Sequence, residues 1–151
     1  MKLEQKNVFI TGSSRGIGLA IAHKFASLGA NVVLNSRGEI SEELLDEFKP
    51  YGVKVLAISG DVSDFTDAKR MVDQAIEGLG SVDVLVNNAG ITQDTLMLKM
   101  TEEDFEKVLK VNLTGAFNMT QAVLKQMIKA REGAIINMSS VCLLYTSPSP
   151  R

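Results

Sequence analysis

The part of the chain best suited to hold a charged ligand is a glycine-rich turn near its start. The turn Thr11-Gly-Ser-Ser-Arg-Gly-Ile-Gly18 follows an apolar run and precedes a helical pattern. Glycines at such a junction let the backbone approach a pyrophosphate, while the helix offers N–H donors and the positive end of its dipole. A structural turn with a solvated Arg15 is the alternative. The predicted phosphate-binding residues are Gly12, Ser13, Ser14, Arg15, Gly16, Ile17 and Gly18.

The elements that must position this turn alternate between apolar runs and helical patterns. Such alternation is typical of βαβ units in a mostly parallel sheet. Several runs are too apolar to alternate, which is expected of strands covered by helices on both faces. We therefore predict an α/β fold with a Rossmann-type, doubly wound parallel sheet. The expected strands are residues 7–11, 31–35, 53–58, 82–86 and 134–138.

Helix ends are also marked in the sequence. Ser41 and Thr101 each precede acidic residues, which is typical of an N-cap followed by the positive end of a helix. An apolar stripe over residues 71–79 predicts a further helix that ends near Gly80. No internal repeat or interdomain linker interrupts this pattern, so we expect a single domain.

Composition excludes several classes of protein. The 151 residues are 45% hydrophobic and 23% charged, with a formal net charge of −2, which gives no electrostatic reason to bind nucleic acid or an anionic membrane. No apolar run approaches the roughly 20 residues needed to cross a bilayer, and the start lacks a secretion signal. The single cysteine, Cys142, excludes a disulfide framework. We expect a cytoplasmic protein without a metal site.

The spacing T-G-x-x-x-G-x-G resembles that of the short-chain dehydrogenase/reductase family, and further segments agree with this family in order. Asn87-Asn-Ala-Gly90 resembles the family element that supports the sheet and lines the cofactor site, and Asp61-Val62 resembles the pair at the adenine end. The matches cover residues 3 to 141 and imply about five of the family's seven strands. The further cofactor-binding residues implied by the resemblance are Asp61, Val62, Asn88, Ala89 and Gly90.

The end of the second expected strand bears on the choice of cofactor. Sites for NAD place an acidic side chain there to accept a hydrogen bond from the ribose 2′-OH. Here the sequence is Leu34-Asn-Ser-Arg37, without a carboxylate. Arg37 and Arg15 could instead bind a 2′-phosphate through their planar guanidinium groups. We therefore predict NADP(H) rather than NAD(H), with a solvent-facing turn residue as the alternative for Arg37.

The resemblance implies carbonyl reduction with a catalytic group that is only half present. The family uses a serine to bind the carbonyl oxygen, a tyrosine as acid, a lysine that lowers the tyrosine pKa, and a helix asparagine that orders a water. Ser140 and Asn112 match the serine and the asparagine. Tyr145 follows Ser140 too closely, and the position four residues later is Ser149 rather than lysine. We expect no ketone reduction by residues 1–151.

The last ten residues, 142–151, depart from the family pattern. Their Thr-Ser-Pro-Ser-Pro run suits an extended linker, and the whole segment also resembles a translated sequencing adapter. We favour the adapter interpretation and expect the true reading frame to continue past Val141 into a Tyr-x-x-x-Lys segment. The expected NADP-binding domain portion is therefore residues 1–141.

Within the family, residues 87–100 and 111–120 are most similar to the bacterial reductases that act on 3-oxoacyl thioesters of acyl-carrier protein. This similarity implies NADPH-dependent reduction in fatty-acid synthesis, a homotetramer, and an acyl-carrier protein partner. Lys129 and Arg131 could contact that acidic carrier, or simply complement a helix C-terminus. Reduction of acetoacetyl-coenzyme A and nucleotide binding without catalysis are the alternatives.

The truncation also bears on folding. Five strands without the remaining ones leave a sheet edge unpaired. The helix that contains Met119 and Val123 packs against partner subunits in the resembling family, so we expect it to expose apolar surface here. A chain that does not fold stably is therefore a third interpretation.

Overall fold

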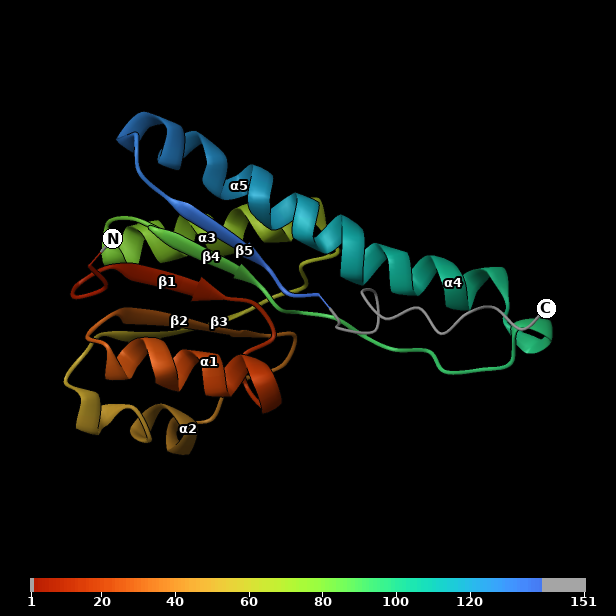
Figure 1. The fold of residues 1–151 in the computed structure, drawn as a ribbon, viewed down its shortest axis with the longest axis horizontal. Coiled ribbons are helices and arrows are strands. Elements are labelled where there is room, and N and C mark those ends of the chain that lie inside the picture. Colours follow the sequence, from red (N-terminus) through yellow and green to blue (C-terminus); the bar gives the residue numbers. More distant parts are fainter. Residues whose placement is uncertain (1, 140–151) are drawn as a thin grey trace, which may run out of the picture.

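The computed structural model describes residues 2–139 and contains one parallel sheet of five strands in the order β3-β2-β1-β4-β5 (Figure 1). This confirms the predicted α/β fold. Each strand lies within two residues of its predicted bounds. The strands are β1 (Asn7–Ile10), β2 (Asn31–Ser36), β3 (Val55–Ser59), β4 (Val84–Asn87) and β5 (Ala134–Asn137).

The strand order reverses direction at β1. From β1 the chain moves outward through β2 to β3, then returns to add β4 on the other side of β1 and β5 beyond it. All four strand pairs are parallel, and β1 pairs in register with both β2 and β4. The crevice beyond the carboxyl ends of β1 and β4 is therefore a topological switch point, where ligands bind in such sheets.

Helices cover both faces of the sheet, as a doubly wound fold requires. Figure 1 shows α1 and α2 on one face and α3 and α5 on the other. Two short 3₁₀ helices, η1 (Lys49–Tyr51) and η2 (Met97–Lys99), lie in the connections. The α-helices are α1 (Gly16–Ser27), α2 (Glu42–Asp46), α3 (Phe65–Leu79), α4 (Glu102–Leu109) and α5 (Gly115–Ala130).

The predicted helix ends are confirmed by their hydrogen bonds. The Ser41 hydroxyl accepts from the N–H of Leu44, and the Thr101 hydroxyl accepts from the N–H of Asp104, whose carboxylate accepts from the Thr101 N–H in return. Gly80 ends α3 in the left-handed conformation, with φ at 92°. Local sequence therefore sets where these helices begin and end.

Strand residues alternate between two hydrophobic clusters, one on each face. Phe9 and Leu85 are buried against α3 and α5, whereas Val8 and Ile10 are buried in the cluster that contains residues of α1. Because both faces are covered, these strands are apolar throughout. None of the helices between residues 2 and 139 combines the length and hydrophobicity that a membrane crossing requires.

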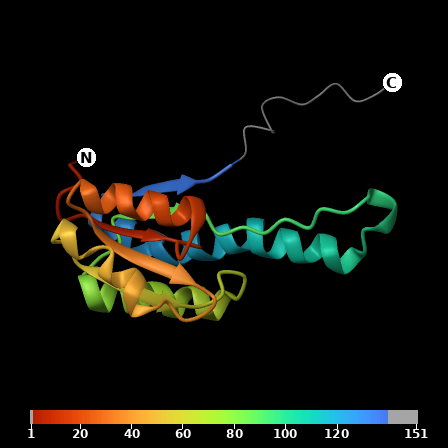
Figure 2. The same ribbon diagram turned by 90° about the horizontal axis from the view of Figure 1, so that it is seen from below.

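A π-helical turn, η3 (Lys110–Thr114), joins α4 to α5 and makes one long helix of them. Figures 1 and 2 show that α4 and the segment before it extend well beyond the sheet. In the π turn, the N–H of Gly115 donates to the carbonyl of Lys110, one residue further back than in an α-helix. Such local widening is frequent at functional sites.

The long helix exposes apolar surface, as predicted. The exposed residues are not Met119 and Val123, the two by which this helix is identified in the sequence. Met119 and Val123 are fully buried in the cluster shared with α3. The exposed apolar residues of the α4–α5 helix are Phe105, Leu109, Leu113, Phe117, Leu124 and Ile128. Because this helix has apolar residues on both of its sides, their spacing in the sequence does not show which side packs on the sheet.

Phe48 should contribute most to holding α2 and η1 against the sheet. Its ring is fully buried and stacks on the imidazole of His23 in α1, with ring centroids 4.2 Å apart. We expect Phe48→Ala to lower the free energy of unfolding by about 3–5 kcal/mol in urea denaturation. The control Tyr51→Phe removes only a hydroxyl that lies 3.3 Å from His23 Nδ1, so it should cost less than about 1 kcal/mol. Equal losses in the two variants would contradict this account.

Candidate functional site

Two adjoining hollows lie at the carboxyl ends of the strands. A groove of about 540 Å³ runs along the glycine-rich turn, and a cavity of about 550 Å³ lies between β4, β5 and the start of α5. Both are lined by Val62 and by Asn88, Ala89 and Gly90, so the groove and the cavity meet at the loop after β4. Together they form one continuous candidate site at the topological switch point.

The groove brings together nearly all residues that the sequence assigns to cofactor binding. They come from the loops after β1, β2, β3 and β4, which are far apart along the chain. The predicted residues that line the groove are Gly12, Ser14, Arg15, Gly16, Ile17, Gly18, Arg37, Asp61, Val62, Asn88, Ala89 and Gly90. Cofactor binding itself stays a prediction.

Ser13 is the one predicted groove residue that does not line it. Its side chain is fully buried, and its hydroxyl donates to the carbonyl of Ile10 at 2.7 Å and accepts from the N–H of Asn35 at 2.9 Å. The Ser13 N–H donates to the carbonyl of Asn35 at 2.8 Å. Ser13 therefore fastens the turn to β2 and points away from the space where a ligand would lie.

The turn needs glycine for two separate reasons. Gly12 and Gly16 have φ values of 62° and 59°, a left-handed conformation that other residues rarely adopt. Gly18 is needed for packing, because a Cβ there would lie 2.3 Å from the carbonyl oxygen of Gly12 and 2.5 Å from the Asn88 side chain. The first turn of α1 can therefore sit directly against the loops after β1 and β4.

The start of α1 offers hydrogen-bond donors to the groove. Arg15 is the N-cap residue, and its side chain makes no capping hydrogen bond to the helix. The first N–H groups of a helix lack partners within it and carry the positive end of its dipole. The space beside Gly16 is open, since an added Cβ would meet nothing within 4 Å. An anionic group such as a phosphate could approach these N–H groups closely.

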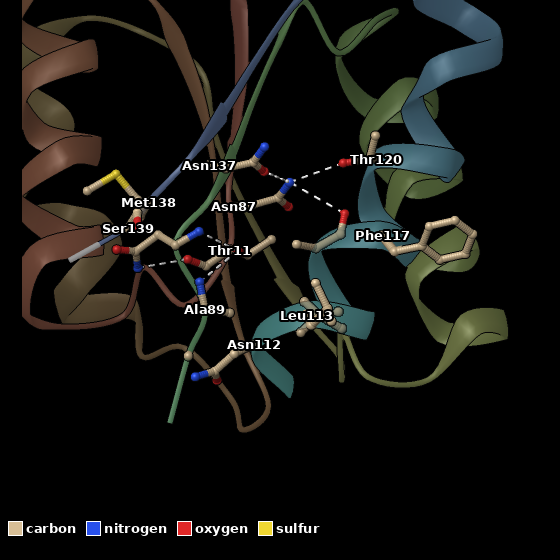
Figure 3. A pocket seen from close by; sticks show the side chains of 15 residues that line it. Thr11, Asn87, Ala89, Asn112, Leu113, Phe117, Thr120, Asn137, Met138 and Ser139 are labelled. Atoms are coloured by element: carbon tan, nitrogen blue, oxygen red, sulfur yellow. Dashed lines mark hydrogen bonds between the residues drawn. The ribbon is translucent and has the colours of Figure 1, made fainter. Parts of the chain in front are cut away.

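A hydrogen-bonded junction between Thr11 and Asn88 holds the two central loops together. The Thr11 hydroxyl donates to the carbonyl of Val86 and accepts from the N–H groups of Asn88 and Ala89 at 3.0 and 2.9 Å. The Asn88 side chain donates to the carbonyls of Thr11 and Gly12, both at 3.0 Å. These bonds, drawn in part in Figure 3, fix the loop after β4 beside the glycine-rich turn.

Asn35 performs a similar task on the other side of β1. It is almost fully buried, and its side-chain oxygen accepts from the N–H of Gly12 at 3.2 Å. Its amide nitrogen donates to the carbonyls of Ile58 and Gly60 at 3.1 and 3.3 Å. In the sequence, Asn35 stands out only as part of a strand end without a carboxylate. An asparagine that ends a run of buried apolar strand residues was the available signal.

The two arginines that line the groove are exposed at its rim. Arg15 precedes α1, and Arg37 lies on the turn after β2, so they come from different loops but face one site. The turn that carries Arg37 is held by the hydroxyls of Ser36 and Ser59, which both donate to the carbonyl of Gly38. This end of the groove therefore carries two cations without a carboxylate at the tip of β2.

Asn112 lies in the π turn and lines the cavity, but its side chain is engaged. Its amide oxygen accepts from the N–H of Ile91 at 2.8 Å, and its amide nitrogen donates to the carbonyl of Ile91 at 3.0 Å. This reciprocal pair ties the widened helix to the segment after Gly90. The side chain therefore positions backbone, and any ordering of a water by Asn112 stays a prediction.

Asn87 joins the elements that form one side of the cavity. Its amide nitrogen donates to the side chains of Asn137 and Thr120 at 2.9 and 3.2 Å, linking β4 to β5 and α5 (Figure 3). Within residues 2–139, its buried amide oxygen has no hydrogen-bond partner. Ser139 lines the cavity just after β5. The predicted catalytic Ser140 follows it and lies outside the described residues, as do Tyr145 and residues 142–151.

Lys129 and Arg131 are not brought to the site. They lie at the C-terminal end of α5, whereas the cavity is lined by the start of this helix as far as Thr120, about 14 Å before Lys129 along the helix axis. Arg131 is the C-cap residue and has a left-handed backbone, with φ at 54°. A role in contacting a protein partner therefore concerns a surface separate from the groove and the cavity.

Known proteins resemble the chain over almost all of its length. A model of the family described as short chain dehydrogenase matches residues 6–149. The chain is 45% identical over 138 residues to 3-oxoacyl-[acyl-carrier-protein] reductase FabG of Staphylococcus aureus, covering 90% of this chain and 56% of that protein. The protein of the same name from Thermotoga maritima is 45% identical over 152 residues, covering 98% and 61%. The chain thus spans little more than half the length of these relatives.

Removing the Thr11 hydroxyl should lower the stability of the protein without changing the shape of the side chain. Thr11→Val keeps the side-chain volume but leaves the N–H of Ala89 without its acceptor, and the N–H of Asn88 with only the Val86 carbonyl at 3.1 Å. We expect a loss of about 2 kcal/mol in the free energy of unfolding, measured in urea. Thr11→Ser is the matched control, because it retains the hydroxyl and should keep most of the stability. A valine variant as stable as the serine variant would contradict the role given to this junction.

Proposed function

Because the chain belongs to the short-chain dehydrogenase family, we propose that the groove at the end of its sheet binds NADP(H). The observation that carries this proposal is the convergence of four loops on one groove. The glycine-rich turn and the uncapped start of α1 suit a pyrophosphate, and the loop after β4 continues the groove into the cavity. The proposed domain is residues 1–141.

The choice of NADP(H) over NAD(H) rests on charge. A carboxylate at the tip of β2 would repel a 2′-phosphate, and this position holds Ser36 and Arg37 instead. Arg15 lines the same groove from the loop after β1. Guanidinium groups bind phosphate through paired N–H donors, so two of them at one rim favour the more anionic nucleotide. Asp61 would lie at the adenine end.

We propose that the longer protein reduces 3-oxoacyl thioesters, with acyl-carrier protein as the carrier. The support is the similarity to the two proteins named 3-oxoacyl-[acyl-carrier-protein] reductase. When bound, the nicotinamide ring would supply the hydride. In this chain Ser140 would donate a hydrogen bond to the carbonyl oxygen, while Asn112, which lines the cavity, holds the backbone of Ile91 beside the groove. Reduction of acetoacetyl-coenzyme A is a related alternative.

The association of subunits and the docking of a carrier are parts of the same proposal. The apolar side chains exposed along α4 and α5 give the chain a surface suited to association, and we propose a homotetramer for the longer protein. Lys129 and Arg131 could contact an acidic carrier at the far end of α5.

For residues 1–151 taken alone, nucleotide binding without turnover is the favoured function. No Tyr-x-x-x-Lys pair follows Ser140 in the sequence, so the acid that would protonate the forming alkoxide is missing. The groove, by contrast, is built from residues 12–111. Binding and chemistry are therefore separable along this chain.

Replacing Arg37 tests the choice of cofactor. We expect Arg37→Asp to weaken NADPH binding about ten- to hundredfold, because a charge-assisted contact of about 1.5–3 kcal/mol gives way to repulsion. The affinity for NADH should change little. Fluorescence titration of the reduced nucleotides measures both values. The matched control Arg131→Asp makes the same charge change far from the groove and should alter neither. Unchanged NADPH affinity in Arg37→Asp would remove the charge argument.

A turnover assay tests the division between binding and chemistry. Residues 1–151 should bind NADPH but not oxidise it in the presence of acetoacetyl-coenzyme A, measured by the loss of NADPH absorbance. A hybrid in which the C-terminal part of the Staphylococcus aureus relative follows Val141 should oxidise it. Its matched control replaces the tyrosine of the grafted Tyr-x-x-x-Lys segment with phenylalanine. Turnover by residues 1–151 would contradict the proposal, as would a hybrid that binds NADPH but stays inactive.

A further inference from the structure

The adenine end of the groove is held from behind by two charged residues of α3. Asp67 Oδ2 accepts from the N–H of Asp61, a groove residue, at 2.7 Å. Asp67 Oδ1 accepts from Arg70 Nε at 2.7 Å, and Arg70 Nη2 donates to the carbonyl of Ser59 at 2.7 Å. The pair therefore holds both ends of the three-residue segment 59–61, which begins at the last residue of β3.

The side chains of α3 lie close enough to Gly60 to set the path of the backbone there. A Cβ added at Gly60 would lie 2.8 Å from both Arg70 Nη2 and Asp67 Oδ2 and 2.5 Å from Met71 Sδ. On its other side the segment is tied to β2, where the N–H of Gly60 donates to the carbonyl of Ser36 at 2.9 Å. The segment is thus fixed between β2 and the first turns of α3.

The same pair reaches the turn that carries Arg37. Arg70 holds the Ser59 carbonyl, and the Ser59 hydroxyl donates to the carbonyl of Gly38 at 2.9 Å. Gly38 directly follows Arg37 in the groove lining. One ion pair on α3 is therefore linked through the backbone to two parts of the groove.

Asp67 is well suited to this contact because it stays ionised. Partial burial alone would raise its pKa, but the N–H of Asp61 and the guanidinium of Arg70 outweigh that effect and hold the pKa below its usual range. A carboxylate accepts from both donors more strongly than a neutral acid does. The Asp61 N–H and the Arg70 guanidinium thus both face a full negative charge.

We propose that Asp67 and Arg70 form a positioning pair for the adenosine half of the nucleotide, acting through the backbone of residues 59–61. Neither residue lines the groove, so neither would contact the ligand itself. A second ion pair on α3 lacks this geometry, since Lys69 and Asp73 join each other on the exposed side of the helix. The inference rests on the proposed binding of NADP(H).

The test compares variants by their affinity for NADPH and for NADH in fluorescence titrations. Asp67→Asn removes the charge that pairs with Arg70 and should weaken binding of both nucleotides about fivefold, because both carry adenosine. This distinguishes it from Arg37→Asp, which should affect NADPH alone. Arg70→Gln should also weaken binding of both. The double variant should lose about as much affinity as either single variant, because the pair acts as a unit. Asp73→Asn is the matched control and should change neither affinity.

A structural readout shows whether the effect arises at the expected place. Hydrogen exchange of the Asp61 amide should be faster in Asp67→Asn than in the original chain or in Asp73→Asn. Unchanged affinity in both Asp67→Asn and Arg70→Gln would overturn the positioning role and leave the proposed function intact. An equal loss in Asp73→Asn would overturn it by assigning the effect to helix charge. An original chain that binds neither nucleotide would overturn the proposed function and, with it, this inference.

Discussion

The site depends on one hydrogen-bonded junction, formed where the ends of β1 and β4 separate. At a topological switch point the neighbouring loops leave in opposite directions, so their backbone groups lose their sheet partners. The Thr11 hydroxyl and the Asn88 side chain supply those partners and join the two loops. Gly18 lets α1 approach closely enough to lie against this junction. The groove has a fixed floor because these polar groups cannot separate without losing several hydrogen bonds together.

Two buried asparagines and one partly exposed ion pair extend this arrangement across the sheet. Asn35 joins the glycine-rich turn to the end of β3, Asn87 joins β4 to β5 and α5, and Asp67 with Arg70 holds the end of β3 from outside. Burying an amide is costly unless its hydrogen bonds are made, so each such residue favours one relative placement of the elements it joins. The loops at the carboxyl ends are therefore positioned by contacts within the protein.

The sequence predicted the strands, the helix ends and most groove residues, because these follow from apolar periodicity, capping residues and a contiguous motif. It could not predict side-chain direction within a turn, which is why Ser13 was assigned to the groove although its hydroxyl faces β2. Nor could it identify Asp67 and Arg70, whose importance lies in contacts to residues 59–61 that only the packing of α3 reveals. Acidic and basic residues on a helix ordinarily indicate a solvated face.

The groove and the cavity are built from different parts of the chain. The groove uses loops from the first four strands, each joined to its neighbours within residues 2–139. The cavity is walled by β5, the π turn and the start of α5, and its polar side chains are largely engaged in holding backbone. Both amide atoms of Asn112 form hydrogen bonds with the backbone of Ile91. The amide nitrogen of Asn87 donates hydrogen bonds to side chains of β5 and α5. Under the proposed function, these residues would shape the space beside the ligand rather than transfer a proton.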